Sequence, residues 1–252
     1  MKTAVITGAS SGLGREFARQ IVRAFPEVEC FWLIARREGK LAELAGELEG
    51  RKTVCMSLDL CDEGSFAVLE EKLRDEQPEI ALLVNNAGCG YLGNLGELET
   101  EKQTRMTKLN VTALTAVTSL CVPYLIRGAH VINVSSIASF CPNPRMTVYS
   151  STKAYVSSFS RGLREELRSR GVTATAVCPG PMATEFIELG GIKGHSKTFD
   201  ILPYCDPAKV VEGTLFSAKA GRAFYTPTAS YKLYRFIAKV TPQALMVRFA
   251  WT

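Results

Sequence analysis

The stretch that decides the fold is VITGASSGLGREFARQI, residues 5–21. It begins with an apolar run typical of a buried strand and ends in a helical pattern. Between the two, Gly8, Gly12 and Gly14 have the spacing G-x-x-x-G-x-G. Glycine permits a tight turn that brings backbone N–H groups close to an anion, and the positive end of the following helix favours a phosphate there. We therefore predict a strand, a phosphate-binding turn and a helix; a glycine-rich turn without a ligand is the alternative.

The rest of the chain continues this alternation of short apolar runs and longer helical patterns. The short runs are rich in Val, Ile and Ala without polar alternation, as expected of strands buried on both faces. We therefore expect an α/β fold: a three-layer, doubly wound parallel sheet of Rossmann type, with about seven strands and helices on both faces, in one domain over residues 1–252. The predicted strands are Thr3–Thr7, Cys30–Ala35, Thr53–Ser57, Ile80–Val84, His130–Ser135, Thr173–Cys178 and Ala223–Tyr225, and the predicted helices are Gly14–Ala24, Gly39–Glu49, Glu63–Asp75, Lys102–Leu125 and Ser150–Arg170.

Composition and charge narrow the class of protein. Of 252 residues, 46% are hydrophobic and 22% are charged, and the net charge is +5. This is an ordinary soluble composition, and no run of five like charges indicates nucleic-acid binding. The chain enters a strand-like run at once and has no apolar stretch of about 18 residues, so we expect neither a signal peptide nor a membrane span. Eight scattered cysteines without C-x-x-C, and two histidines at no ligand spacing, indicate reduced thiols in a cytoplasmic protein without a metal site.

The end of the second predicted strand carries two arginines. An acidic residue at this place would hydrogen-bond a ribose 2′-hydroxyl and favour NAD. Here the sequence FWLIARREGK places Arg36 and Arg37 there instead. Guanidinium groups bind a 2′-phosphate through charge-assisted, bidentate hydrogen bonds, which favours NADP, with NAD as a second cofactor. The alternative is a solvated pair of arginines at a helix start.

Tyr149 and Lys153 stand four residues apart in VYSSTKAYVSSFSR, residues 148–161. On a helix this spacing places both side chains on one face. A free tyrosine has a pKa of about 10, too high for a base at neutral pH. A cation about 4 Å away contributes roughly 4 kcal/mol at an effective dielectric of about 20, so we expect Lys153 to lower the pKa of Tyr149 toward neutrality and make it a general acid–base group. Taken alone, a tyrosine and a lysine at this spacing on a helix are more often a surface pair.

Six short motifs follow one another along the chain. They are TGASSGLG at 7–14, NNAG at 85–88, Asn110-Val111, NVSS at 133–136, Tyr149-x-x-x-Lys153 and PGPMAT at 179–184. In order and spacing they resemble the short-chain dehydrogenases/reductases, in their compact single-domain branch, over about residues 2–185. The resemblance implies an oxidoreductase that transfers a hydride between the nicotinamide of NADP and a ketone or secondary alcohol.

The resemblance also assigns roles to residues. It implies that Tyr149 exchanges a proton with the substrate oxygen, that Ser136 holds this oxygen, that Lys153 holds the nicotinamide ribose, and that Asn110 orients a water behind Lys153. Ser136 is chosen over Ser135 because it lies thirteen residues before the tyrosine, the usual family spacing. The implied catalytic residues are therefore Asn110, Ser136, Tyr149 and Lys153. The implied cofactor contacts are Gly8, Ser10, Ser11, Gly12, Leu13, Gly14, Arg36, Arg37, Asp59, Leu60, Asn86, Ala87, Gly88, Tyr149, Lys153, Pro179, Gly180, Met182 and Thr184.

Residues 186–252 carry no family motif, and here the sequence indicates how substrate specificity arises. Glu185–Cys205 has three glycines and no clear period, and we expect a mobile substrate lid. Apolar and aromatic residues near the expected pocket favour a bulky, hydrophobic or steroid-like ketone, although such residues would equally seal a lid against its own core. They are Tyr91, Phe140, Met146, Phe186 and Ile187.

The segment Thr226–Thr252 is basic and aromatic, and we expect two short helices broken at Pro242. Three interpretations of its Tyr231, Lys232 and Arg235 pattern remain: a helix packed on the lid, a subunit contact, or a helix resting on an acidic membrane surface. We favour packing within the protein or its dimer. A homodimer or homotetramer through the long predicted helices is expected.

Two other functions are weighed against the reductase. A non-catalytic NADP(H)-sensing protein on the same fold is the alternative, although Tyr149 and Lys153, whose loss would signal it, are both present. A sugar-nucleotide epimerase or dehydratase is the third possibility, but such chains are longer and have a different glycine spacing.

Overall fold

The computed structural model describes residues 1–48, 50–192, 194–250 and 252. A parallel sheet of seven strands runs through it, in the order β3-β2-β1-β4-β5-β6-β7. The strand order reverses between β1 and β4, and in sheets of this kind ligands bind beyond the carboxyl ends of the strands at that point. The strands are β1 Lys2–Thr7, β2 Cys30–Ala35, β3 Lys52–Ser57, β4 Glu79–Asn85, β5 Leu125–Val134, β6 Thr173–Val177 and β7 Phe224–Tyr225.

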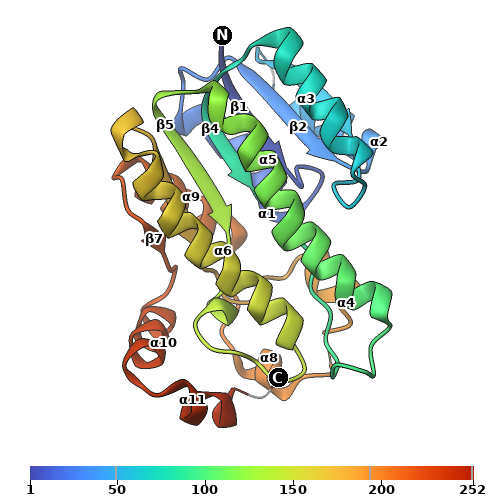
Figure 1. Cartoon of the computed structure of the whole chain (residues 1–252), viewed down its shortest axis with the longest axis vertical. Coiled ribbons are helices and arrows are strands. Elements are labelled where there is room, and N and C mark those ends of the chain that lie inside the picture. The colour runs from blue at the N-terminus through green and yellow to red at the C-terminus, as the bar shows by residue number, and fades with distance from the viewer. Residues whose placement is uncertain (49, 193, 251) are drawn as a thin grey trace.

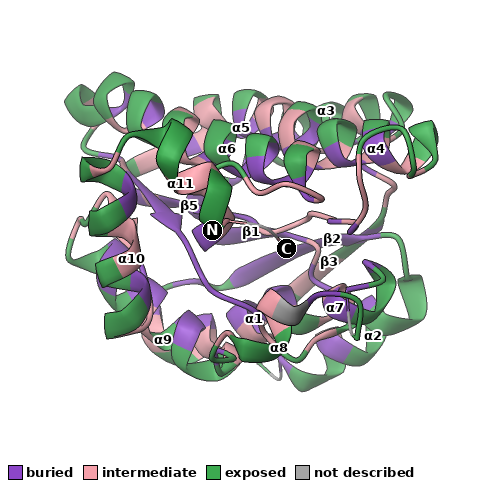
Figure 2. Cartoon of the chain, turned by 90° about the horizontal axis from the view of Figure 1, so that it is seen from below, coloured by how far each residue is buried: buried purple, intermediate pink, exposed green. Residues whose placement is uncertain are grey.

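Helices cover both faces of the sheet, which confirms the predicted fold class (Figures 1 and 2). One layer holds α1 (Gly12–Ala24), α2 (Glu38–Glu47) and α9 (Pro207–Lys219). The other holds α3 (Gly64–Glu76), α4 (Thr100–Thr107), α5 (Leu114–Cys121) and α6 (Thr147–Glu166).

Strand β2 shows why the predicted strands lack polar alternation. Phe31 and Leu33 pack into the core on the α1 side, and Trp32 and Ile34 pack into the core on the α3 and α5 side. Because successive side chains of a strand point to opposite faces, a strand covered on both sides is apolar throughout.

The prediction of one continuous helix over Lys102–Leu125 is wrong, because the segment is interrupted and ends before Leu125. The chain forms α4, then a π-helical turn η1 (Lys108–Ala113), then α5 and a 3-10 turn η2 (Val122–Tyr124). Leu125 already belongs to β5, where it pairs with Ile80 of β4. Pro123 has no N–H for a continuing helix, and the pairing with β4 takes the chain into the sheet. Strand β5 is therefore longer than predicted, and the π-helical turn contains Asn110.

Three further segments, outside the alternation of strands and helices, are ordered into helices. The 185–205 segment contains α7 (Glu185–Leu189) and α8 (Lys197–Ile201), so it is more regular than the sequence indicated. Helix α9 was not predicted, although Asp206 caps it and Pro207 opens it, a common helix start. Two C-terminal helices, α10 (Ala229–Val240) and α11 (Gln243–Phe249), flank Pro242 as predicted.

The remaining helices begin and end within a few residues of their predicted bounds. Helix α6 begins at Thr147, ahead of Tyr149, and a 3-10 turn η4 (Arg168–Arg170) follows it. The predicted end of the second helix, Glu49, lies outside the described residues, as do Lys193 of the expected lid and Trp251 of the C-terminal segment. Over the described ranges, no helix combines the length and the apolar character needed to cross a bilayer.

Candidate active site

A cavity of about 880 Å³ lies at the carboxyl ends of the strands. Its walls come from the loops after β1, β2, β4, β5 and β6, from the 185–205 segment, and from α10 and α11. Every predicted cofactor contact except Gly14 lines this cavity, and so do Ser136, Tyr149 and Lys153. Residues predicted from separate motifs therefore meet in one place.

The glycine turn brings the backbone of β1 close to that of β4. Gly8 and Gly12 have φ angles of +66° and +51°, which other residues rarely adopt. A side chain at Gly8 would stand 2.9 Å from the Cα of Ala87, and one at Gly14 would collide with the carbonyl oxygen of Gly8. Gly14 thus allows the first turn of α1 to pack closely against the glycine turn. The cavity wall itself is formed by the neighbouring residues Gly8, Gly12 and Leu13.

The amide of Asn86 fixes the other side of the turn. Its Nδ2 donates hydrogen bonds to the carbonyl oxygens of Thr7 and Gly8, both at 3.1 Å. The Oγ1 of Thr7 accepts from the backbone N–H groups of Asn86 and Ala87 at 3.0 and 3.1 Å. These hydrogen bonds join the chain after β1 to the chain after β4 and form the floor of the cavity at this end.

Two guanidinium groups stand beside the glycine turn. Arg37 Nη2 donates to Ser10 Oγ at 3.2 Å, and the Arg37 guanidinium forms two hydrogen bonds with the Glu185 carboxylate, at 3.2 and 2.8 Å. The hydrogen bond with Arg37 lowers the pKa of Glu185, although burial acts in the opposite direction. Sequence reasoning placed Arg37 here but missed Glu185, because no local pattern links residues so far apart.

Arg36 borders the same end of the cavity near Asp59. Arg36 Nη1 lies 4.0 Å from Asp59 Oδ2, and Arg105 Nη2 lies 3.1 Å from the same oxygen. Burial would raise the pKa of Asp59, but the Cys61 N–H and the two arginines outweigh it and lower that pKa. Arg105, which the sequence did not single out, thus helps to hold Asp59 ionised.

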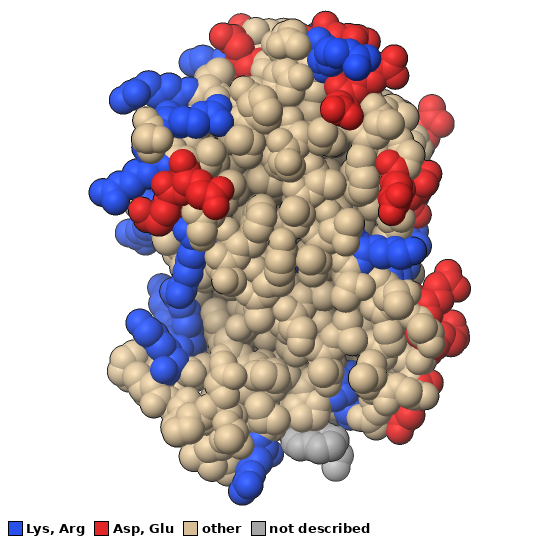
Figure 3. Space-filling model, viewed as in Figure 1, with Lys and Arg blue, Asp and Glu red and all other residues tan. Residues whose placement is uncertain are grey.

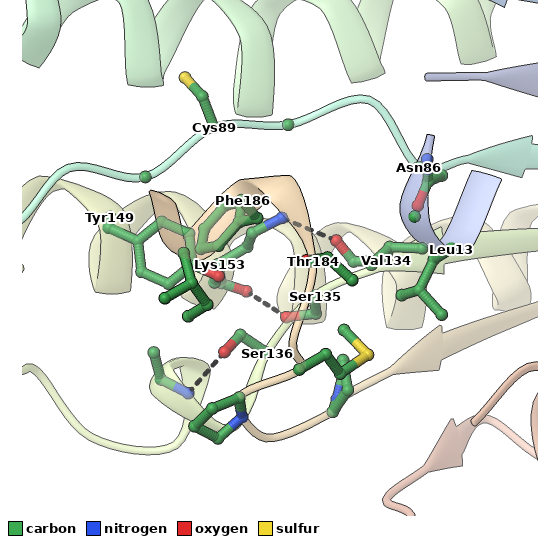
Figure 4. Close-up of a pocket in the computed structure, with 18 of the residues that line it drawn as sticks. Leu13, Asn86, Cys89, Val134, Ser135, Ser136, Tyr149, Lys153, Thr184 and Phe186 are labelled. Atoms are coloured by element: carbon green, nitrogen blue, oxygen red, sulfur yellow. Dashed lines mark hydrogen bonds between the residues drawn. The ribbon is translucent and has the colours of Figure 1, made fainter. Parts of the chain in front are cut away.

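Ser136 and Tyr149 face one another across the other end of the cavity, where Tyr149 comes from α6 and Ser136 follows β5 (Figure 4). Both side chains are buried, and the Ser136 hydroxyl acts to lower the pKa of the Tyr149 phenol. Ser136 Oγ also accepts from the backbone N–H of Ala138 at 3.1 Å. Ser135 Oγ instead donates to the carbonyl oxygen of Lys153 at 2.8 Å and lies 2.9 Å from Ser157 Oγ. The neighbouring serines therefore have different partners, and Ser136 is the one that meets the tyrosine.

Lys153 lies beside Tyr149 but does not lower its pKa in this structure. Its Nζ donates to the carbonyl oxygen of Val134 at 2.9 Å and lies 5.7 Å from the centroid of the Tyr149 ring (Figure 4). Burial lowers the pKa of Lys153 to about 8. Burial also raises the pKa of Tyr149 to about 12, although the nearby Ser136 hydroxyl acts in the opposite direction. The prediction that Lys153 lowers the pKa of Tyr149 toward neutrality is therefore wrong for this structure, because desolvation opposes the charged form of each group.

Asn110 stands behind the cavity wall and does not line it. Its Oδ1 accepts from the Cys89 N–H at 2.9 Å, and its Nδ2 donates to the Cys89 carbonyl at 2.8 Å and to Thr152 Oγ1 at 3.0 Å. A side chain at Gly88 would stand 3.0 Å from Asn110 Oδ1 and 3.4 Å from Lys153 Nζ. The amide therefore ties the loop after β4 to α6 next to the lysine, and its water-orienting role stays a prediction.

The cavity wall beyond Tyr149 is apolar. Tyr91, Met146, Phe186 and Ile187 line it as predicted, and the Phe186 ring lies 5.7 Å from the Tyr149 ring. Phe140 does not line the cavity; its ring packs against Tyr234. Sequence reasoning missed further lining residues, because the folds of the 185–205 segment and of the C-terminal helices decide which side chains point inward. They are Leu189, Phe199, Leu202, Tyr231, Tyr234, Met246 and Phe249.

Metal ligation is not a feature of the described part of the chain. Within it, no three His, Cys, Asp or Glu side chains are grouped so that they could hold an ion.

Comparison with known proteins shows which family has this sequence and this fold. Residues 2–189 match the family model described as short chain dehydrogenase. The very-long-chain 3-oxoacyl-CoA reductase of Anas platyrhynchos is 31% identical over 195 residues, which cover 74% of this chain and 61% of that relative. The chain matches about three fifths of the length of the first curated relatives.

Two solved structures extend the likeness to almost the whole chain. A short-chain dehydrogenase from Sphingobium yanoikuyae in complex with NADPH has a TM-score of 0.83 and 28% identity, over 98% of this chain and 95% of that one. The bulky-bulky ketone specific alcohol dehydrogenase from Comamonas testosteroni has a TM-score of 0.76 and 27% identity, over 98% and 94%. With a family model that matches well over half of its residues, a doubly wound parallel sheet and a serine, tyrosine and lysine gathered at one cavity, the chain belongs to the short-chain dehydrogenase family.

Proposed function

We propose that this protein is an NADP-dependent oxidoreductase that transfers a hydride between nicotinamide and a ketone or secondary alcohol. One observation carries the proposal. A single cavity joins a glycine turn and two arginines at one end to the buried side chains of Ser136 and Tyr149 at the other. The first end suits the phosphates of a dinucleotide, and the second suits the oxygen of a carbonyl.

The residues of the cavity fit a dinucleotide. A side chain at Gly8 would collide with Asn86 and Ala87, Gly12 has a φ of +51° that favours glycine, and the loop Asn86–Gly88 forms the opposite wall. Pro179, Gly180, Met182 and Thr184 line the cavity after β6. Bound nicotinamide supplies or takes the hydride, and the chain has to hold the substrate oxygen and move one proton.

Tyr149 is the proposed general acid. With its pKa raised to about 12, the phenol is protonated at neutral pH, the form that donates a proton to a carbonyl oxygen during reduction. Ser136 donates a second hydrogen bond to that oxygen and holds it in place. Lys153, buried beside Gly88 and Tyr149, is proposed to hold the ribose of the cofactor, and Asn110 is proposed to position Lys153 and the loop after β4.

The preference for NADP rests on Arg36 and Arg37. Both guanidinium groups border the cavity at the end where the adenosine ribose would lie. Arg37 donates to Ser10 beside the turn, and Arg36 lies near Asp59. The similar dehydrogenase from Sphingobium yanoikuyae binds NADPH. Binding of NAD in the same cavity is the alternative.

The proposed substrate is a bulky, hydrophobic ketone. Support comes from the apolar wall beyond Tyr149, in which Phe186, Met146 and Phe249 are among the lining residues. The similar alcohol dehydrogenase from Comamonas testosteroni is specific for ketones described as bulky-bulky. We further infer one domain over residues 1–252, in which the 185–205 segment is the lid and residues 226–252 close the far wall.

The experiment that tests the function is a panel of ketones, from small aliphatic to steroid-like, assayed with NADPH and with NADH. We expect NADPH consumption that increases with the size and hydrophobicity of the ketone. Tight NADPH binding without NADPH consumption in the presence of any ketone of the panel would contradict the proposal and favour the NADP(H)-sensing alternative. Ser136→Ala serves as the control for background oxidation of the cofactor.

A further inference from the structure

Helix α10 carries apolar residues on the side that faces away from the protein. Leu233, Phe236, Ile237 and Val240 have the spacing i, i+3, i+4, i+7, and each is between 41% and 62% exposed. Tyr231 and Ala238, on the other side of the helix, are buried. A surface helix normally turns one apolar stripe inward and polar residues outward, so α10 has a second apolar stripe that this chain leaves uncovered. We call these four residues the outer stripe.

Helix α11 extends this apolar region. It follows α10 after only Thr241 and Pro242, and its Leu245 and Phe249 are 49% and 81% exposed. Figure 1 shows the two helices together at one end of the molecule, next to the C-terminus. Six large apolar side chains are therefore exposed on two consecutive short helices.

The charge of this part of the chain has one sign. Residues 213–252 contain no Asp or Glu, and their basic residues are Lys219, Arg222, Lys232, Arg235, Lys239 and Arg248. In Figure 3 the region of α10 and α11, at the lower left, shows lysine and arginine and no acidic side chain. Lys232, Phe236 and Lys239 have the spacing i, i+4, i+7, so two exposed lysines lie along one edge of the outer stripe on the helix surface.

This combination selects between possible partners. A second copy of the chain, docked about a two-fold axis, would bring the same basic surface against itself, and like charges across an interface are unfavourable. A bilayer with anionic lipids accepts both features, because apolar side chains enter the boundary of the acyl chains while lysines reach the headgroups.

The surface is also part of the cavity wall. Tyr234, Met246 and Phe249 line the cavity, so α10 and α11 form part of the cavity wall beside the outer stripe. The chain end is held there by hydrogen bonds from Arg145 Nη1 to the Thr252 carbonyl at 2.8 Å and from Thr252 Oγ1 to the Pro144 carbonyl at 2.6 Å. A protein resting on its outer stripe would thus have the wall of its cavity next to the lipid.

We propose that α10 and α11 form a docking surface for an anionic lipid bilayer, with the outer stripe in the headgroup–acyl boundary and Lys232 and Lys239 on the headgroups. The docking itself does not depend on the proposed reaction. Only its consequence does: a hydrophobic ketone dissolved in the bilayer would enter the cavity without crossing water.

Vesicle flotation of the full chain tests this proposal. The vesicles are phosphatidylcholine alone and phosphatidylcholine mixed with phosphatidylglycerol. We expect flotation with the mixed vesicles, weakened by added salt. The variant Leu233→Ser/Phe236→Ser/Val240→Ser should lose flotation, whereas the matched variant Val68→Ser/Leu95→Ser, at exposed apolar sites on other elements, should keep it. Each lysine near an anionic surface increases the affinity for the bilayer roughly fivefold. The affinity of Lys232→Glu/Lys239→Glu for the mixed vesicles should therefore be lower than that of the wild type by at least about tenfold.

Controls separate docking from folding and from self-association. The pair Lys2→Glu/Lys209→Glu makes the same charge change elsewhere and should bind vesicles more tightly than Lys232→Glu/Lys239→Glu. NADPH binding and thermal unfolding show that each variant is folded, and no turnover enters the measurement. Absence of flotation by the wild-type chain would overturn the proposal. So would equal flotation of the outer-stripe variant, or a wild-type dimer in sedimentation that the outer-stripe variant converts to a monomer without any vesicle binding.

Discussion

The guanidinium of Arg37 forms two hydrogen bonds with the carboxylate of Glu185, at 3.2 and 2.8 Å. Arg37 follows β2, and Glu185 is the first residue of α7, so this ion pair joins the adenosine end of the cavity to the 185–205 segment. The same guanidinium is a proposed ligand of the 2′-phosphate. A bound phosphate and the Glu185 carboxylate would therefore share one cation.

Removing the negative charge of Glu185 should strengthen NADPH binding. In Glu185→Gln the side chain keeps its shape but no longer opposes a phosphate, and half-exposed ion pairs contribute up to about 1 kcal/mol. We expect the Kd for NADPH to fall by up to about fivefold and the Kd for NADH to stay unchanged. Fluorescence titration at low salt measures both, and Glu188→Gln, three residues further along α7, is the control. A weaker affinity for NADPH, or an equal gain for NADH, would contradict this account.

Arg36→Asp should reverse the cofactor preference. A charge-assisted hydrogen bond contributes about 1.5–3 kcal/mol, so the affinity for NADPH should fall by roughly ten- to a hundredfold. The affinity for NADH, which has no 2′-phosphate, should fall by less than about threefold. Arg74→Asp, an exposed arginine of α3, controls for the change in net charge. Equal losses for the two cofactors would remove the 2′-phosphate assignment.

Replacement of Ser135 and of Ser136 by alanine should have different effects on kcat and on stability. Ser136→Ala removes the hydroxyl that meets Tyr149, and we expect kcat to fall by about 10²- to 10³-fold with little change in stability. Ser135→Ala removes hydrogen bonds to Lys153 and Ser157, which should cost about 1 kcal/mol of unfolding free energy and leave most of kcat. Steady-state kinetics and urea unfolding distinguish the two. A larger loss of kcat in Ser135→Ala would reverse the assignment.

Burial of Lys153 predicts an unusual dependence of stability on pH. Its pKa is lowered from 10.5 to about 8 in the folded protein, so between these values the unfolded chain binds more protons. Stability increases with pH wherever the unfolded state binds more protons, so this lysine should make the folded state more stable as the pH rises from about 8 to about 10. Tyr149 acts in the opposite direction only above about pH 10, where the unfolded phenol loses its proton first.

Lys153→Met isolates this contribution, because methionine does not titrate. We expect the free energy of unfolding of the wild type, minus that of Lys153→Met, to increase between about pH 7.5 and about pH 9.5 in urea titrations. Lys209→Met, at an exposed site in α9, should show no such difference. Parallel curves for the wild type and Lys153→Met would show that the lysine is not desolvated.

The sheet and the cavity could be predicted because their signals are local. Buried parallel strands are apolar runs, and Gly8, Gly12 and Gly14 mark a turn by their spacing alone. The end of the helix before β5 could not be predicted, since Leu125 joins the sheet through its pairing with Ile80, a contact between residues far apart in sequence. The direction of the Tyr149 pKa was missed for a similar reason: the charge of Lys153 was visible in the sequence, but the burial that outweighs it was not.

The C-terminal helices show the same limit. The break at Pro242 was predicted from the sequence, and so was the basic and aromatic character of the segment. Which face of α10 lies against the protein depends on the tertiary packing of Tyr231, and this packing leaves the outer stripe exposed. The sequence favoured packing within the protein or its dimer, and within this chain α10 packs on one side only.

The most direct test of the central claim is a single turnover by Tyr149→Phe. The enzyme is loaded with NADPH, mixed with the best ketone of the panel, and followed by the loss of nicotinamide absorbance. We predict that the Kd for NADPH changes by less than about threefold, since phenylalanine keeps the ring against Phe186, while the rate of hydride transfer falls by about 10³-fold or more. Hydride transfer close to the wild-type rate, with NADPH bound as tightly, would contradict the assignment of Tyr149 as the proton donor.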